Sequence, residues 1–315
     1  MDAAAVPDTD FALRYAWDEQ SVWSQTADSL KRTLFRTRAA ALCLTIVAGL
    51  FGALVKPATD LISPDTGLVF AWLAAACAGV LAVVLGKLGG RDQVRAWARG
   101  RSVSEAIKAE VYIFLAGVSP YRGRDRATQL TEKLRAIEGE AKSVRRETIN
   151  VKPVTRELPP VCDVASYITE RVRRQIDEYY RPKSGEVKRR AYQFRAVEIV
   201  LATIGALVSA TASAPIGHGV AAWLPVVTTI MAVVTAEAAF QRYDELALEY
   251  TCTADQLESA LVDRNLGARA NSEAADDEFV HASELIISIQ NQAWMARRVT
   301  DDVGAAPGGT SQESA

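Results

Sequence analysis

The stretch "AWLAAACAGVLAVVLGKLGGR", residues 71–91, decides the fold, because it resembles both a phosphate-binding loop and a membrane span. A P-loop requires G-x-x-x-x-G-K-[ST], so that backbone amides surround the phosphates and a hydroxyl reaches magnesium. Here six apolar residues separate Gly79 from Gly86, and Leu88 stands where the motif requires Ser or Thr. An uncharged run of this length is typical of a helix that crosses a bilayer, and glycine is favoured just past a helix end. The P-loop interpretation is therefore rejected.

Similar apolar segments occur elsewhere in the 315 residues, and they form two pairs. Crossing the hydrocarbon core takes about 20 helical residues, because each residue adds about 1.5 Å. The predicted spans are about 39–55 and 68–86 in the first pair, and about 196–214 and 220–240 in the second. Buried core helices are the alternative, but four such segments in one chain of this size disfavour it. We therefore predict an all-α membrane protein with two duplicated transmembrane hairpins and a cytoplasmic helical bundle.

Basic residues flank the outer ends of both predicted hairpins, whereas the loops 56–67 and 214–222 contain Lys56 as their one basic residue. The flanking residues are Lys31, Arg32, Arg36, Arg38, Lys87, Arg91, Arg95, Lys188, Arg189, Arg190, Arg195 and Arg242. The positive-inside rule then predicts a multi-pass membrane protein with both termini in the cytoplasm. The first forty residues are acidic and lack an apolar core, so they do not resemble a signal peptide.

Composition argues against several classes of function. The net charge of −2 does not favour a nucleic-acid partner, and the four cysteines and two histidines show no spacing typical of a metal site. No residues are spaced like a nucleophile with its base or like an isolated carboxylate pair, so we do not expect an enzyme. We also expect no cofactor.

Small residues recur at every fourth position within two of the predicted spans. They are Ala75, Gly79, Ala82 and Gly86 in the second span, and Ala202, Ala206 and Ala210 in the third. Such spacing lets helix backbones approach closely in lipid. It predicts tight hairpins and a homo-oligomer.

Charged residues bracket the second hairpin at its predicted cytoplasmic edge. Glu198 and Glu237 lie near Arg195 and Arg242, so either a gating role or interfacial ion pairing is open for them. The preceding stretch 171–195 carries nine basic residues, whereas acids dominate residues 237–278. These two stretches could be complementary faces of a helix pair. Alternatively, Lys188, Arg189 and Arg190 could contact anionic lipid or another anionic ligand.

Three prolines mark a linker at residues 150–160, which separates a predicted domain at 1–149 from one at 161–303. Each domain would contain one two-span hairpin. The last residues, 304–315, are predicted to be a disordered tail because they are rich in glycine, serine and alanine.

Both halves resemble the SLATT family, the SMODS- and SLOG-associating two-transmembrane effector domains of bacteria. In the first half the resemblance lies in "WARGRSVSEAIKAEVYIFLAGVSPY", with Trp97, Arg101, Glu105 and Lys108. In the second half it includes "YITERVRRQIDEYY" and "SELIISIQNQAW", with Glu284 and Trp294. The family has no agreed catalytic residues, so these motif positions have no assigned role.

The resemblance implies a membrane-embedded effector of a bacterial conflict or anti-phage system, located in the bacterial inner (plasma) membrane. Such effectors are thought to oligomerise into a pore, or to perturb the membrane, once a sensor or nucleotide signal activates them. The expected partners are the lipid bilayer, further copies of the chain, and a sensor or nucleotide-signalling protein encoded nearby. A non-conducting scaffold that recruits a cytoplasmic partner through its helical region is the alternative.

Overall fold

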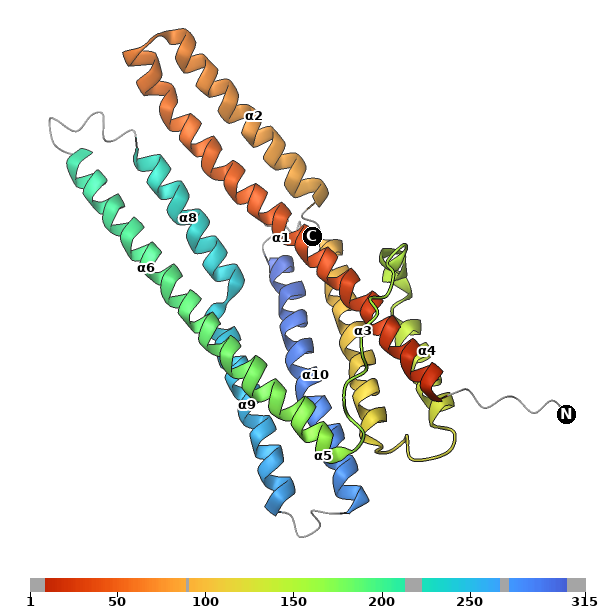
Figure 1. Ribbon diagram of the computed structural model, residues 1–315. Helices are drawn as coiled ribbons and strands as arrows, with labels where there is room; N and C mark the ends of the chain where they lie inside the picture. Colours follow the sequence, from red (N-terminus) through yellow and green to blue (C-terminus); the bar gives the residue numbers. More distant parts are fainter. Residues whose placement is uncertain (1–8, 89–90, 213–222, 267–271, 305–315) are drawn as a thin grey trace, which may run out of the picture. The chain divides into compact units, whose positions relative to one another are not determined.

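The structure is a computed structural model that describes residues 9–88, 91–212, 223–266 and 272–304 (Figure 1). Helices account for the secondary structure of the described residues, and no strand occurs among them, so the predicted all-α class is confirmed. The long helices are α1 (Thr9–Leu61), α2 (Pro64–Leu88), α3 (Arg91–Ala116), α4 (Arg126–Glu140), α6 (Arg181–Ala212), α8 (Leu224–Gln241), α9 (Tyr243–Leu266) and α10 (Glu273–Gly304). Shorter elements are the 3₁₀ helix η1 (Lys142–Thr148), α5 (Val164–Tyr167), and the π-helical turns η2 (Ile168–Arg173) and η3 (Gln175–Tyr180).

The chain divides into two compact units. The membrane unit comprises residues 32–93 and 186–245, and the core unit comprises residues 1–31, 94–185 and 246–315. Each unit therefore contains parts of both sequence halves, and α1 and α6 each contribute residues to both units. The predicted domains 1–149 and 161–303 do not coincide with these compact units, and they remain a prediction about sequence duplication.

The membrane unit contains four helical segments that are long and apolar enough to cross a membrane. They lie side by side in the order α2, α1, α8, α6 (Figure 1). The rings of Phe51 and Phe70 pack 6.0 Å apart between α1 and α2. A Cβ atom added to Gly49 would lie 3.3 Å from the Thr229 methyl of α8, and one added to Gly205 of α6 would lie 3.6 Å from Val227. The two hairpins therefore meet through α1 and α8.

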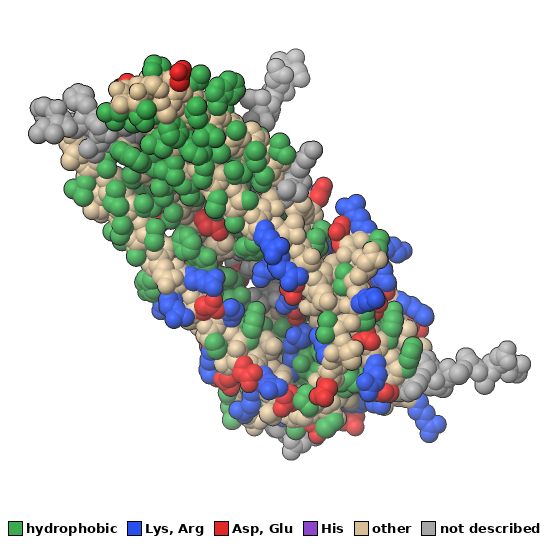
Figure 2. Space-filling model, turned by 45° about the horizontal axis from the view of Figure 1, so that its top comes forward, with side chains coloured by type: hydrophobic (Ala, Val, Ile, Leu, Met, Phe, Trp, Pro, Cys, Tyr) green, Lys and Arg blue, Asp and Glu red, His purple; other side chains and the backbone are tan. Residues whose placement is uncertain are grey.

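The surface of the membrane unit is apolar on the faces that a soluble protein would cover with polar groups. In the most apolar 18-residue stretch of each of these helices, at most 6% of the residues are buried. Trp72 and Leu207 are 69% and 62% exposed. Figure 2 shows hydrophobic side chains covering this unit almost continuously. Burying such a surface in lipid would remove a large cost of hydration, so the four segments suit membrane spans better than core helices. Parts of the third and fourth predicted spans, residues 213–214 and 220–222, lie outside the described residues.

The core unit is a conventional helical core in which residues from distant parts of the chain meet. Its fully buried side chains include Trp23 of α1, Ile107 of α3, Leu130 of α4, Leu257 of α9 and Val280 of α10. Close packing of this kind stabilises each helix through its apolar face rather than through intrinsic helix propensity.

The predicted linker at 150–160 is non-helical, but it is held against α1 within the core unit. Trp17 donates from Nε1 to the carbonyl of Glu157 at 2.9 Å, and the Val154 amide donates to Ser21 at 3.0 Å. The Arg156 guanidinium lies 3.8 Å from the centre of the Trp17 ring. The segment 150–160 therefore packs against α1 and is fixed to the core unit by these contacts. The predicted tail beyond Gly304 lies outside the described residues.

Candidate functional site

An ion pair joins the two hairpins at the end of the spans where charged residues resume. Arg38 of α1 donates from Nε to the Glu237 carboxylate of α8 at 2.9 Å, and these side chains are 30% and 18% exposed. The Arg38 guanidinium also lies 3.2 Å from the centre of the Phe240 ring, and Gln241 donates to the other carboxylate oxygen of Glu237. Partial burial and the aromatic contact make this Arg38–Glu237 bridge stronger than an exposed pair.

The partners of the other predicted interfacial charges come from α9. Arg195 pairs with Asp244 at 2.6 Å, and Arg242 pairs with Glu245 at 3.0 Å. Glu198, by contrast, makes no hydrogen bond or ion pair within the described part of the chain. Arg242 adopts a left-handed backbone conformation with φ 47°, which ends α8 and lets α9 begin at the next residue. Glu237, Arg195 and Arg242 therefore each form an ion pair, but their partners are not one another.

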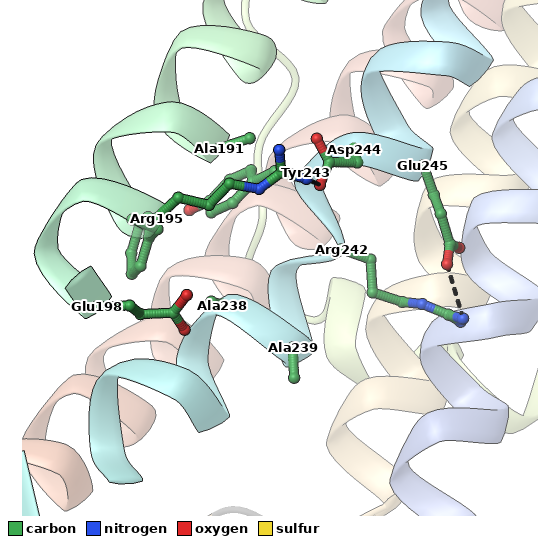
Figure 3. A pocket seen from close by; sticks show the side chains of 10 residues that line it. Ala191, Arg195, Glu198, Ala238, Ala239, Arg242, Tyr243, Asp244 and Glu245 are labelled. Carbon is green, nitrogen blue, oxygen red and sulfur yellow. Dashed lines mark hydrogen bonds and ion pairs between the residues drawn. The ribbon is translucent and has the colours of Figure 1, made fainter. Parts of the chain in front are cut away.

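A cavity of about 330 Å³ lies at this helix break (Figure 3). The rings of Phe194 and Tyr243 pack 5.3 Å apart beside it. Its lining residues come from α6 and from the α8–α9 junction, and they are Ala191, Phe194, Arg195, Glu198, Ala238, Ala239, Arg242, Tyr243, Asp244 and Glu245. The cavity therefore combines apolar walls, two guanidinium groups and the Glu198 carboxylate, which has no partner among the described residues.

The small residues predicted to pack helices are exposed. This holds for Ala75, Gly79, Ala82, Gly86, Ala202, Ala206 and Ala210. The glycines at which an added Cβ atom would lie close to another helix within the chain include Gly49, Gly67 and Gly205. Packing through the predicted faces thus remains a prediction about contacts between copies of the chain.

Some basic residues of the stretch 171–195 pair with acidic residues of another helix, as complementary faces of a helix pair would. Arg181, near the middle of the stretch, pairs with Glu258 of α9 at 2.5 Å, and Arg195, at its end, pairs with Asp244. Arg190 pairs along its own helix with Glu186 at 2.7 Å. Lys188 and Arg189 are exposed. A lipid contact by these basic residues remains a prediction.

A buried ionic cluster lies in the core unit. Arg171 donates two hydrogen bonds of 2.9 Å to Glu284, and the two side chains are 2% and 4% exposed. Tyr167 donates a third hydrogen bond to Glu284 at 3.0 Å, and the Arg171 guanidinium lies 4.4 Å from the centre of the Tyr112 ring. Both carboxylate oxygens of Glu284 accept hydrogen bonds. These bonds offset the free-energy cost of burying the two charges, which would be very large for an unpaired charge.

This Arg171–Glu284 cluster gathers several of the motif positions that had no assigned role. Glu284 is in it directly, and Lys108 of α3 lies within electrostatic range of both Arg171 and Glu284. Arg101 and Glu105 form an ion pair of 2.6 Å one turn before Lys108. Trp97 is buried, whereas the side chain of Trp294 lies outside the described residues.

Sequence reasoning missed the central role of Arg171 and Tyr167. Their spacing of four residues, which places them on one helix face, is the signal in the sequence that points to a shared contact. Arg171 was counted with the exposed basic residues because its neighbours Arg173 and Arg174 are basic. In the structure it lies inside the π-helical turn η2, whose wider turn is a feature often found at functional sites.

Two family models match the chain, one in each half. Residues 167–294 match the model of the SMODS and SLOG-associating 2TM effector domain 1. This segment is therefore similar to a SLATT domain. Residues 21–129 match a protein family of unknown function, DUF4231. No curated protein and no solved structure matches the chain.

The SLATT segment contributes Tyr167, Arg171 and Glu284 to the cluster, and the DUF4231 segment contributes Lys108 and Tyr112. The two matched segments therefore share one core instead of folding side by side. SLATT membership supports a membrane effector of conflict systems, and the all-helical architecture fits a non-enzymatic role. Among the described residues no group of three or more His, Cys, Asp or Glu is arranged to hold a metal ion.

Lys108 predicts a pH dependence of stability. Burial, and next the charge of Arg171, lower the pKa of Lys108 from 10.5 to about 8. The folded protein therefore releases this proton at lower pH than the unfolded chain does. Stability should rise between about pH 8 and pH 10.5, and Lys108→Met should stabilise the protein at pH 7 by about 1–3 kcal/mol.

Unfolding midpoints of purified protein at pH 7 and pH 10 would measure this effect. Lys133→Met removes an exposed lysine from α4 and should leave both midpoints nearly unchanged. A Lys108→Met variant that is less stable than the parent at pH 7 would show that the lysine is needed as a cation.

Proposed function

We propose that this protein is a membrane-embedded effector of a bacterial conflict or anti-phage system, which oligomerises in the inner membrane and forms a pore when activated. A sensor or nucleotide signal from a protein encoded nearby would be the trigger. The SLATT match of residues 167–294 is the observation that carries the proposal.

The exposure of the spans supports the need for several copies. At most 6% of the residues in the most apolar stretch of each span are buried within one chain. The spans of a single copy therefore bury few side chains against one another. The threonines of α8 do not favour a polar path within one copy, since Thr228 and Thr229 donate to backbone carbonyls of their own helix. A conducting path would instead form between copies, for which the exposed small-residue faces provide close contacts.

The Arg38–Glu237 bridge supports a closed state in which the two hairpins of one chain stay together. It is a partly buried polar contact between α1 and α8, at the level where the spans end. In this proposal activation separates the hairpins, and the apolar faces of α1 and α8 then become available to neighbouring copies.

Induced expression in bacteria that carry a membrane-potential dye tests the proposal. Depolarisation and growth arrest are expected on activation, with stepwise currents when the purified protein is reconstituted in planar bilayers. An unrelated four-span protein at equal expression controls for membrane crowding. Cells that stay polarised and viable under every activating condition would contradict pore formation.

A scaffold remains the second candidate, because α10 exposes two apolar residues spaced by four. Leu285 and Ile289 are 58% and 55% exposed, which fits an apolar contact with a partner. A scaffold would protect cells without any current, and Leu285→Asp/Ile289→Asp would abolish that protection. Currents from the purified protein would decide against it.

A further inference from the structure

We propose that the cavity at the α8–α9 break binds the headgroup of an aminophospholipid, with the lipid's primary ammonium on Glu198. The inference concerns a lipid site within the membrane unit. It is independent of whether the protein conducts.

The position of the cavity favours a lipid occupant. Glu198 immediately precedes the apolar run that begins at Ile199, and Ala238 and Ala239 end the span of α8 on the other wall. Ile199 and Val200 beside it are 67% and 56% exposed, which provides an apolar surface for acyl chains. An occupant therefore meets polar groups at one end and lipid-facing helix at the other, as a phospholipid at the membrane interface requires.

The charges of the lining favour an ammonium. The two guanidinium groups are already balanced, Arg195 by Asp244 and Arg242 by Glu245. The Glu198 carboxylate makes no hydrogen bond or ion pair within the described chain, yet it is half-buried and lines the cavity (Figure 3). The cavity thus carries one uncompensated negative charge, and a cation held there would be stabilised in surroundings less polar than water.

A primary ammonium fits this carboxylate better than a quaternary one. It can donate hydrogen bonds to the carboxylate, whereas the trimethylammonium of a choline lipid cannot. The phosphate of the same headgroup would lie near Arg195, which uses one terminal nitrogen for Asp244 and keeps other N–H donors. The rings of Phe194 and Tyr243 would pack against the methylene groups between ammonium and phosphate.

Native mass spectrometry of the full-length protein in detergent tests the proposal. Phosphatidylethanolamine, phosphatidylcholine and phosphatidylglycerol with identical acyl chains are offered at equal concentration. Phosphatidylethanolamine is expected to give the most abundant adducts, and Glu198→Gln to weaken its binding about tenfold, the effect of losing one charge-assisted hydrogen bond. Glu198→Asp, which keeps the charge, should restore part of the binding.

Glu140→Gln is the matched control, because it makes the same change at an exposed position of α4 and should leave binding unchanged. Equal adducts of the three lipids, or phosphatidylethanolamine binding that survives Glu198→Gln, would overturn the proposal. Soluble phosphoethanolamine forms a further arm. If it displaces the lipid at equal concentration, the cavity is a small-molecule amine site and not a lipid site. None of these outcomes depends on ion conduction.

Discussion

Replacing Glu284 by Ala is expected to destabilise the core unit by about 3–5 kcal/mol, the usual cost of removing one partner of a buried ion pair. Arg171 is 2% exposed and would lose both of its hydrogen bonds to Glu284. Tyr167 would lose its acceptor in the same step. The guanidinium cannot neutralise itself by releasing a proton, so it would remain buried and unpaired. We therefore expect the unfolding midpoint to fall by about 10 °C.

Thermal unfolding of purified protein in detergent, followed by tryptophan fluorescence, measures this loss. Glu258→Ala breaks the exposed pair with Arg181 and should cost at most about 1 kcal/mol. The double variant Arg171→Met/Glu284→Met should be more stable than either single variant, since it removes both charges together. A midpoint in Glu284→Ala that equals that of Glu258→Ala would show that the cluster is not buried in the native protein.

A disulfide between α1 and α8 is expected to reduce conduction to background by holding the two hairpins together. The Cβ position at Gly49 lies 3.6 Å from Thr229 Cβ, within the range of about 3.5–4.5 Å that disulfides require. The variant Gly49→Cys/Thr229→Cys is made after the native free cysteines Cys43, Cys77, Cys162 and Cys252 have been replaced by serine. If activation separates the hairpins, the oxidised protein cannot conduct, and a reducing agent should restore the current.

Planar-bilayer currents before and after reduction test whether the disulfide prevents conduction, and the two single-cysteine variants are the controls. Those variants add the same side chains but cannot form the cross-link within one chain. Full activity of the oxidised double variant would show that α1 and α8 stay together during opening. A pore would then have to form without separation of the hairpins.

The sequence alone determined the membrane spans and the helical class. Uncharged runs such as residues 68–86 have a length that fits a bilayer, and their surfaces are costly to leave in water, so neither conclusion depends on distant contacts. The sequence also placed Glu237 at the edge of a span, and the resemblance to the SLATT family marked Glu284 and Lys108 as motif positions. The small-residue faces that the sequence assigned to helix contacts are exposed within one chain, and close helix approaches occur at Gly49, Gly67 and Gly205.

Only the tertiary structure decided which of these residues meet. Glu237 pairs with Arg38, which lies 199 positions away, and Glu284 pairs with Arg171, which lies 113 positions away. The periodicity of one helix shows which face avoids water, but the choice of partner depends on how several such faces pack against each other. The left-handed turn at Arg242 is a further example, because no glycine marks it, and it is this turn that ends α8 at the cavity containing Glu198.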